Sequence, residues 1–242
     1  MNKTLLVIGA SSDIGQAYIK KYQNRYDKII CTYYKNKDAV TQLYNWLPEK
    51  IVPYQLNLSR EEDVNAFGES LIQEGNLPGF FLFLPAQTTQ MQRVYQMNVE
   101  KVRTDFEIEV ISVLTLFKYI IPNMQKEQFG RICFMLSSVT VSPTAFNSSY
   151  HISKYALLGL MKSAAIELAP KKITVNAVSP TMIDTKFISS ASPLAKKSCI
   201  ENSPLKRLAS TDDVIVSIAH LLDEENSFET GQNLLLSGGM LF

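Results

Sequence analysis

The sequence predicts an α/β fold: a single doubly wound domain built on a seven-stranded parallel sheet with helices on both faces. Short, nearly unbroken apolar runs recur along the chain, which is typical of strands that are buried on both faces. Longer amphipathic stretches separate these runs, and that alternation indicates βαβ units with right-handed crossovers. The 242 residues contain no repeat, linker or second periodic block, so we expect one domain over residues 1–242.

The elements follow in order along the chain. The expected strands are the apolar runs at 4–8, 28–32, 51–56, 80–84, 130–136, 173–178 and 232–236. The expected helices are the amphipathic stretches at 15–26, 38–47, 61–74, 101–125, 149–169 and 211–222. Residues 181–208 interrupt this rhythm, because they are rich in Ser, Pro, Lys and Ala and have little apolar periodicity. A long irregular segment in a compact domain is typical of a substrate lid, and a plain surface excursion is the alternative.

Composition argues against several classes of protein. The chain carries 24 Lys and Arg against 23 Asp and Glu, so its net charge of +1 provides no basic field for nucleic acid. The first apolar run, at residues 5–8, is too short for a signal peptide or a membrane span. Cys31, Cys133 and Cys199 lie far apart without metal-ligand spacing, which favours free thiols in a reducing compartment. We therefore expect a cytoplasmic protein without membrane, nucleic-acid or metal partners.

A loop with a glycine at each end follows the first expected strand and leads into a helix. Glycines at such a place let the backbone turn sharply and approach a pyrophosphate at a helix N-terminus. Two glycines alone are a weak signal, but their position after the first strand of a parallel sheet strengthens it. The candidate cofactor-binding residues of this loop are Gly9, Ser11, Ser12, Asp13, Ile14 and Gly15.

The end of the second expected strand indicates which cofactor is bound. An NAD site normally has a carboxylate near this end to hold the ribose hydroxyls. Here the chain has Tyr33, Tyr34 and Lys35, then Lys37, and the first acidic residue is Asp38, beyond the strand end. Lysines suit a 2′-phosphate, so the sequence favours NADPH/NADP. The alternative is that the lysines belong to a solvated loop, and the tyrosines could stack near the adenine or simply pack.

Three residues are candidates for acid–base chemistry. Tyr150 and Lys154 stand four positions apart at the start of an expected helix, which places them on one face, a turn apart. A free phenol has a pKa of about 10, and a neighbouring ammonium favours the phenolate, so the pair could exchange a proton with a carbonyl or an alcohol. Ser138 follows the preceding strand, at the sheet edge where parallel sheets bind ligands. Each signal alone is weak, because serines are common in turns and Tyr–Lys pairs are common on helices.

Taken in order, these motifs resemble the short-chain dehydrogenase/reductases, and are most similar to the branch of the 3-oxoacyl-[acyl-carrier-protein] reductases. The resemblance runs nearly end to end, and its C-terminal part covers 174–180, 204–208 and 230–239. It implies a Rossmann-type fold in which NADPH delivers hydride to a ketone. It also implies that Tyr150 protonates the ketone oxygen, that Ser138 orients it, and that Lys154 holds the nicotinamide ribose and tunes the tyrosine.

The same resemblance implies further contacts and partners. Asn57 and Leu58 fall where the family contacts adenine, and Thr185 falls where it contacts the carboxamide. Other implied cofactor-binding residues are Pro85, Ala86, Pro180, Thr181 and Ile183. The helices at 101–125 and 149–169 correspond to the dimer faces of the family, so a homotetramer or homodimer is implied.

Several positions depart from the family pattern. Ile8 and Leu84 replace a threonine and an asparagine that the family links by a hydrogen bond, and we expect them to pack together as a compensated pair. Asp13 replaces a loop glycine, where it could cap the helix and should point away from the phosphates. Gln87 replaces a glycine near the nicotinamide ribose. Glu109 falls on the catalytic asparagine of the family, which holds a water that links the lysine to solvent.

Two interpretations of Glu109 remain open. An ionised carboxylate near Lys154 would stabilise the lysine cation and partly cancel its effect on Tyr150, which would shift the pH optimum. In the other interpretation Glu109 turns away and makes a structural contact. The favoured function is NADPH-dependent reduction of a ketone, such as a 3-oxoacyl thioester or a similar small carbonyl compound, free or carrier-bound. The alternative is a catalytically impaired NADP-binding homologue that acts as a sensor or scaffold.

Overall fold

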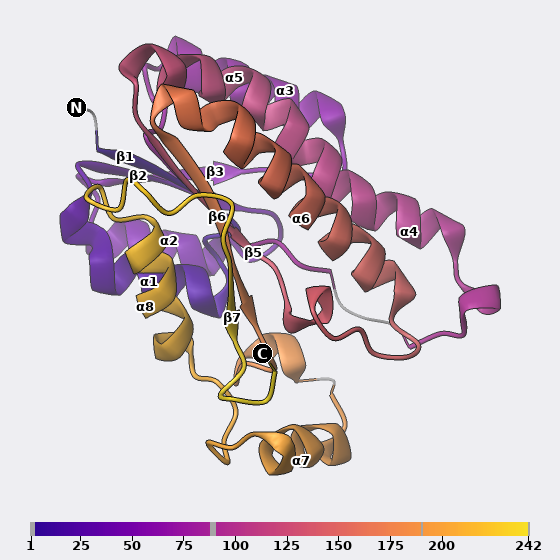
Figure 1. Cartoon of the computed structure of the whole chain (residues 1–242). Coiled ribbons are helices and arrows are strands. Elements are labelled where there is room, and N and C mark those ends of the chain that lie inside the picture. The colour runs from indigo at the N-terminus through magenta and orange to yellow at the C-terminus, as the bar shows by residue number, and fades with distance from the viewer. Residues whose placement is uncertain (1–2, 88–90, 190, 242) are drawn as a thin grey trace.

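A parallel sheet forms the centre of the protein, whose structure is a computed structural model that describes residues 3–87, 91–189 and 191–241. Its seven strands lie in the order β3-β2-β1-β4-β5-β6-β7 (Figure 1). They are β1 (Thr4–Ile8), β2 (Lys28–Tyr33), β3 (Ile51–Gln55), β4 (Phe80–Phe83), β5 (Gly130–Met135), β6 (Ile173–Pro180) and β7 (Asn233–Leu236). The predicted seven-stranded parallel sheet is confirmed.

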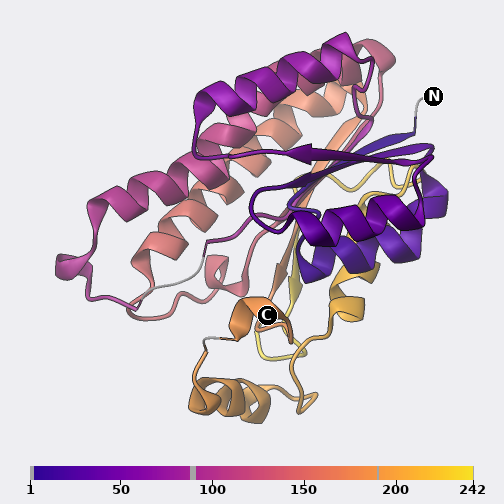
Figure 2. The same cartoon turned by 180° about the vertical axis from the view of Figure 1, so that it is seen from behind.

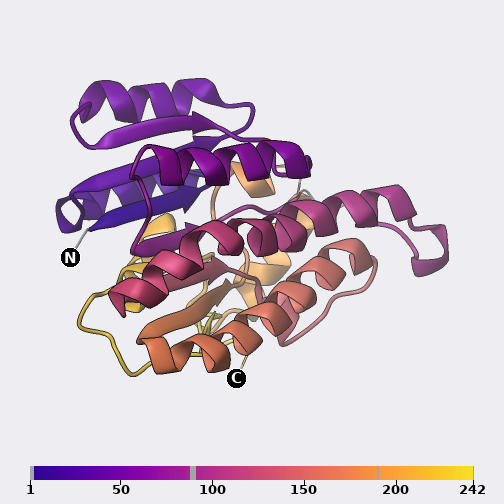
Figure 3. The same cartoon turned by 90° about the horizontal axis from the view of Figure 1, so that it is seen from above.

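Two helical layers cover the sheet, one on each face (Figure 1, Figure 3). On one face lie α1 (Asp13–Tyr22), α2 (Lys37–Trp46) and α8 (Thr211–Leu221), and on the other lie α3 (Glu61–Gln73), α5 (Ser112–Glu127) and α6 (Ser148–Leu168). Leu5 and Val7 of β1 join the core under the first layer, and Leu6 and Ile8 join the core under the second. Because successive side chains point to opposite faces and both faces are covered, β1 is apolar at nearly every position.

The long helix expected over 101–125 is not one regular α-helix. The chain forms α4 (Val99–Phe106), a π-helical turn η3 (Glu107–Ile111) and then α5, which follow one another along α6 (Figure 3). In the π turn the amide of Ser112 donates to the carbonyl of Glu107, five residues earlier. Such a turn holds one more residue than an α-helical turn, and it is found mostly at functional positions. Here it carries Glu109, whose side chain is fully buried.

The segment 181–208 is more regular than its composition predicts. It contains the short helix η6 (Lys186–Ile188) and the longer helix α7 (Pro193–Asn202), so the expectation of an irregular segment throughout is wrong. Ser192 caps α7 by accepting from Ala195 N, with proline at the first helical position, and this pair of residues was the missed signal. In both views α7 lies apart from the two helical layers, near the C-terminus (Figure 1, Figure 2).

The remaining short helices are single 3₁₀ turns. They are η1 (Gln23–Arg25), η2 (Val94–Gln96), η4 (Ser138–Thr140) and η5 (Ala169–Lys171). Of the helices in the described ranges, none is long and apolar enough to cross a membrane.

Candidate active site

The candidate site lies where the order of the strands reverses. β1 pairs with β2 on one side and with β4 on the other, so the loops that follow β1 and β4 diverge at this point. In open α/β sheets such a switch point, at the carboxyl ends of the strands, is where ligands bind. The two loops are adjacent, because a Cβ atom built on Gly9 would lie 3.5 Å from Cβ of Leu84.

The loop after β1 has the geometry of a phosphate cradle. Gly9 has a φ of +83°, a conformation that favours glycine, and a Cβ atom on Gly15 would lie 2.9 Å from Cα of Ala10. Ser12 caps α1 by accepting from Gly15 N at 3.1 Å, and it donates to Gly9 O at 2.8 Å. Ser11 and Ser12 are at least partly exposed, whereas Ile14 is buried. The first turn of α1 thus presents backbone N–H groups beside a close backbone approach, which fits a pyrophosphate.

Asp13 does not cap α1, contrary to one expectation, because Ser12 is the capping residue. Its carboxylate instead accepts from the backbone amide of Lys186 at 2.8 Å. The side chain is therefore directed to the segment 181–208 and joins it to the loop after β1. Sequence reasoning could not find this contact, since its partners are 173 positions apart.

The end of β2 holds the loop after β1 in place. Thr32 accepts from Ala10 N through its carbonyl at 2.9 Å and from Gly9 N through its hydroxyl at 3.1 Å. Beyond it, Tyr33 is half-buried and Tyr34 is exposed, with Nζ of Lys35 lying 5.5 Å from the centroid of the Tyr34 ring. The exposed lysines and the lack of a carboxylate at 33–37 fit a 2′-phosphate.

The two residues expected near adenine follow β3. Leu56 donates its amide to Tyr33 O at 2.8 Å, so this stretch lies beside the end of β2. Asn57 Oδ1 accepts from the amide and hydroxyl of Ser59, which leaves the Asn57 side-chain NH₂ available to a ligand. Leu58 is half-buried and packs on the core beneath α3.

The candidate catalytic residues come from β5 and α6. Tyr150 and Lys154 stand one turn apart on α6, with Nζ of Lys154 lying 5.6 Å from the centroid of the Tyr150 ring. Ser138 begins η4, which follows β5 and packs against α6. Among the described residues, neither the Ser138 hydroxyl nor the Tyr150 hydroxyl has a hydrogen-bond partner, and both residues are only half-buried. Both hydroxyls are therefore available to a ligand.

Lys154 is held by three oxygen atoms. Its Nζ donates to the carbonyls of Pro85 and Met135, each at 3.2 Å, and lies 2.8 Å from Oε2 of Glu109. Both charged side chains are fully buried. Burial alone would lower the pKa of Lys154, but the charges of Glu109 and Tyr150 outweigh burial and raise the pKa above that of a free lysine. The interpretation in which Glu109 turns away from Lys154 is therefore wrong.

The loop after β4 departs from one prediction. Leu84 donates its amide to Ile8 O at 3.1 Å, so the two residues are backbone neighbours. However, Ile8 is in register with Phe83 and shares its core, whereas Leu84 belongs to the core on the opposite face. The expected packing of Ile8 against Leu84 is wrong, because neighbouring residues of a strand point to opposite faces of the sheet.

The segment after β6 forms the far side of the site. Pro180 is the last residue of β6, and Thr181 donates its amide to Leu236 O at 3.1 Å. Ile183 pairs with Ala209, which closes the base of the segment that follows. Thr185 is half-buried and directly precedes η6. These residues therefore lie at the same edge of the sheet as the loops after β1 and β4.

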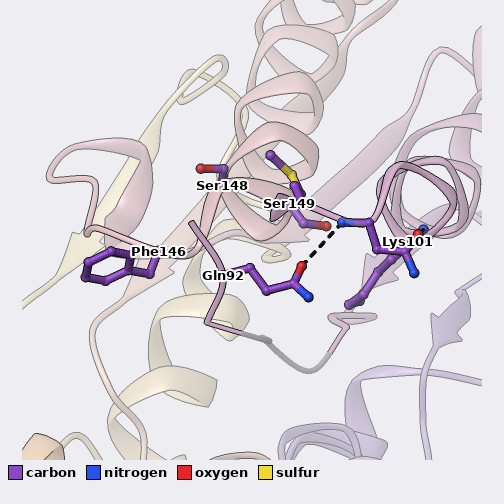
Figure 4. Close-up of a pocket in the computed structure, with 7 residues that line it drawn as sticks. Gln92, Lys101, Phe146, Ser148 and Ser149 are labelled. Carbon is purple, nitrogen blue, oxygen red and sulfur yellow. Dashed lines mark hydrogen bonds between the residues drawn. The ribbon is translucent and has the colours of Figure 1, made fainter. Parts of the chain in front are cut away.

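A small pocket beside the start of α6 contains a polar network that sequence reasoning missed. Figure 4 shows Gln92, Lys101 and Ser149 among the residues that line it. Asp105 is buried nearby and accepts from Nζ of Lys101 at 2.8 Å and from the Ser149 hydroxyl. This network joins α4 to α6 one residue before Tyr150. The spacing of four between the lysine and the aspartate was the available signal.

Other chemistry has no visible centre in the described part of the chain. No group of three or more His, Cys, Asp and Glu side chains there could hold a metal ion. Cys31 and Cys133 are buried free thiols, and burial raises the pKa of both.

Comparison with known proteins agrees with this arrangement. A family model described as enoyl-(acyl carrier protein) reductase matches residues 9–241. The 3-oxoacyl-[acyl-carrier-protein] reductase FabG of Thermotoga maritima is 27% identical over 99% of this chain and 98% of its own length.

Solved structures give the same result. One described as ElxO with NADP bound has a TM-score of 0.87 and 26% identity, covering 99% of both chains. The acetoin dehydrogenase YohF of Salmonella typhimurium has a TM-score of 0.83 and 27% identity, covering 99% of this chain and 97% of that one. With the sheet, the loop after β1 and the family match in agreement, this chain belongs to the short-chain dehydrogenase/reductase family of oxidoreductases.

Proposed function

We propose that this protein is an NADPH-dependent reductase that transfers a hydride to a ketone, either a 3-oxoacyl thioester or a similar small carbonyl compound. The observation that carries the proposal is that the hydroxyls of Ser138 and Tyr150 have no hydrogen-bond partner among the described residues, with the buried Lys154 ammonium 5.6 Å from the centroid of the Tyr150 ring. Hydroxyls free of internal hydrogen bonds can bind a carbonyl oxygen, and a cation beside a phenol favours its loss of a proton.

Each residue has one task in the proposed reaction. Bound NADPH would supply the hydride. The Tyr150 phenol donates its proton to the oxygen of the carbonyl as negative charge develops there. Ser138 donates a hydrogen bond to the same oxygen and fixes its position. Lys154 stabilises the resulting phenolate through its charge.

The proposed preference for NADPH rests on the end of β2. Lys35 and Lys37 are exposed there, and residues 33–37 include no carboxylate. ElxO, a relative at 26% identity, has been solved with NADP bound. The residues proposed to contact the cofactor are those of the loops after β1 and β4, the end of β2, the stretch 57–58 and the stretch 180–185.

The proposed substrate class follows from the relatives and from α7. Several curated relatives at 26–28% identity, including those of Thermotoga maritima and Rickettsia prowazekii, are described as 3-oxoacyl-[acyl-carrier-protein] reductases. We propose that 181–208 is a lid over the substrate. Lys196 and Lys197 on α7, together with Lys206, could attract the acidic surface of a carrier protein.

We also propose that the protein works in the cytoplasm as a homotetramer or homodimer. Exposed apolar side chains on α4, α5 and α6 support an interface there, and they include Val99, Leu114, Ile152, Tyr155 and Ile166. Size-exclusion chromatography with light scattering tests this proposal, and a monomer at micromolar concentration would contradict it.

Consumption of NADPH tests the proposed reaction. The substrate panel holds acetoacetyl thioesters, acetoin, diacetyl and an enoyl thioester, which separates ketone reduction from reduction of a carbon–carbon double bond. We expect turnover with a ketone, and Tyr150→Phe should lose at least about a hundredfold in kcat while it still binds NADPH. Turnover of the enoyl thioester alone would contradict the assignment.

A second function is favoured by one observation, the engagement of Lys154 by three oxygens. A lysine held in this way is less available to a ligand, which suits a cofactor-binding sensor or scaffold that has lost turnover. Tight NADPH binding without oxidation by any member of the panel would favour that second function.

A further inference from the structure

We propose that Glu109 is a positioning residue that serves as the buried counter-charge of Lys154 and links this lysine to the loop after β4. The inference deepens the proposed reductase function and rests on it for the pH effect. The linkage to the loop is independent of catalysis and can be tested in the protein without cofactor.

The first argument is the accounting of donors on Lys154. An ammonium group has three protons and accepts nothing. Its Nζ has three oxygen neighbours, which are the carbonyls of Pro85 and Met135 and the carboxylate of Glu109. Two of them are neutral backbone atoms, so Glu109 is the only charged group in this set. The lysine is thus directed away from solvent, and its Nζ lies 5.6 Å from the centroid of the Tyr150 ring.

The second argument is burial. Neither Lys154 nor Glu109 exposes any side-chain surface. A buried lysine without a counter-charge tends to lose its proton, because the charged form is poorly solvated. The carboxylate at 2.8 Å opposes this tendency, and the pKa of Lys154 is raised despite its burial. Removal of the carboxylate leaves an isolated charge that the protein must accommodate or neutralise.

The third argument is that Glu109 and Lys154 together hold the loop after β4. Oε1 of Glu109 accepts from the amide of Gln87 at 3.2 Å, while Lys154 donates to the carbonyl of Pro85 in the same loop. One ion pair therefore contacts both ends of a three-residue stretch. The π turn of η3 carries the carboxylate into this position between α6 and the loop.

The expected pH effect follows from the groups that surround the Lys154–Glu109 pair. α6 contributes Lys154 and the half-exposed His151, η3 contributes Glu109, and the loop after β4 and strand β5 contribute backbone carbonyls and an amide. Asp105 of α4 is already paired with Lys101. Glu109 is therefore the carboxylate that pairs with Lys154, and an uncharged side chain at 109 leaves the buried ammonium without a counter-charge and favours its loss of a proton.

Two variants separate charge from hydrogen bonding. Glu109→Gln removes the charge but keeps an oxygen that can accept from Gln87, whereas Glu109→Ala removes both. Glu107→Gln, an exposed carboxylate on the same π turn, is the matched control. Loss of the carboxylate that raises the pKa of Lys154 should move the limb of the pH–rate profile that reports this lysine to lower pH by about one unit in Glu109→Gln. The profile of Glu107→Gln should equal that of wild type.

Hydrogen exchange of the loop after β4, measured without cofactor or substrate, is the second readout. We expect faster exchange at residues 84–87 in Glu109→Ala, and near wild-type exchange in Glu109→Gln and Glu107→Gln. Exchange in Glu109→Ala equal to that of wild type, or a pH profile of Glu109→Gln equal to that of wild type, would overturn the assignment. Failure of the reductase activity itself would leave the exchange result intact, so the two failures are distinguishable.

A third variant covers the case in which Glu109→Gln does not fold. The double substitution Glu109→Gln with Lys154→Met removes both charges, and it should fold because no isolated charge remains. Recovery of cooperative unfolding in the double variant supports the coupling. If the double variant were no more stable than Glu109→Gln alone, the two side chains would not act as a pair.

Discussion

At the scale of single residues, hydrogen bonds within the chain decide which atoms of the candidate site remain open to a ligand. Thr32 and Ser12 form hydrogen bonds with the backbone of the loop after β1 and so hold its shape from within the chain. Ser138 and Tyr150 have hydroxyls without partners among the described residues, whereas the amine of Lys154 is fully engaged. The site therefore combines a preformed cradle with two open donors, which is what substrate binding requires.

The lysines after β2 give the first residue-scale prediction. Replacing both Lys35 and Lys37 by alanine removes the cations proposed to meet the 2′-phosphate. The dissociation constant for NADPH should rise by about tenfold or more, while that for NADH should change little. Fluorescence titration with both cofactors measures this. Lys20→Ala, an exposed lysine on α1, is the control, and equal losses for NADPH and NADH would contradict the assignment.

Gly15 gives the second prediction at the scale of single residues. A methyl group there would lie 2.9 Å from backbone atoms of Ala10, which cannot move like a side chain. Gly15→Ala should lower the free energy of unfolding by about 1–3 kcal/mol, as measured in urea. Gly159→Ala on α6 is the matched control, because nothing lies within 4 Å of the added carbon. That change should raise helix stability by up to about 1 kcal/mol.

At the scale of elements, two segments that interrupt the regular alternation of strands and helices shape the candidate site. The π turn interrupts the helix between α4 and α5 and carries Glu109 inward. The segment 181–208 is anchored at its base by the pairing of Ile183 with Ala209, and it is tied to α1 by the carboxylate of Asp13. Glu109 of the π turn pairs with Lys154 of α6, and Lys186 of the segment bonds to Asp13 of α1, so both segments connect residues that are far apart in the chain.

The tie between Asp13 and Lys186 gives the element-scale prediction. Asp13→Ala removes the acceptor of the Lys186 amide, so the segment 181–208 should open more readily. We expect faster cleavage within this segment by trypsin and a several-fold faster dissociation of NADPH. Asp38→Ala, an exposed carboxylate in the first turn of α2, is the control. Unchanged cleavage would show that the contact does not restrain the segment.

At the scale of the whole molecule, a buried cation, Arg131, lies at the end of the sheet opposite the candidate site. Arg131 of β5 is 3% exposed and donates to the carbonyls of Asp223 and Glu224 after α8, and to that of Lys172 before β6. This guanidinium joins the sheet to a helix from each side of it. The candidate catalytic residues and this buried guanidinium thus lie at opposite ends of the strands.

Arg131→Met tests this separation. It removes four hydrogen bonds to backbone carbonyls, so the free energy of unfolding should fall by about 2–4 kcal/mol, as seen by chemical denaturation. The KM and kcat of the folded enzyme should stay within about twofold, because the change lies at the other end of the sheet. Arg60→Gln, on the surface, should change neither property. A large loss of kcat at full folding would contradict the separation.

Local patterns were enough to predict the sheet and part of the site. Buried strands are recognisable because each apolar run is continuous, and the pairing of Gly9 with Gly15 is recognisable because one backbone turn demands both. The π turn within 101–125 and the helix α7 were not predicted. A π turn leaves no clear mark on the periodicity, and α7 buries no side chain that would give it an apolar face.

The sequence by itself determined the fold class, and it predicted the place of the cofactor loop and the candidate residues Ser138, Tyr150, Lys154 and Glu109. Only the tertiary structure decided what Glu109 and Asp13 contact, and that Ile8 and Leu84 face opposite cores. The physical reason is the range of the interactions. Propensity, capping and periodicity act between residues a few positions apart, whereas an ion pair or a hydrogen bond between distant segments depends on how whole helices and strands pack.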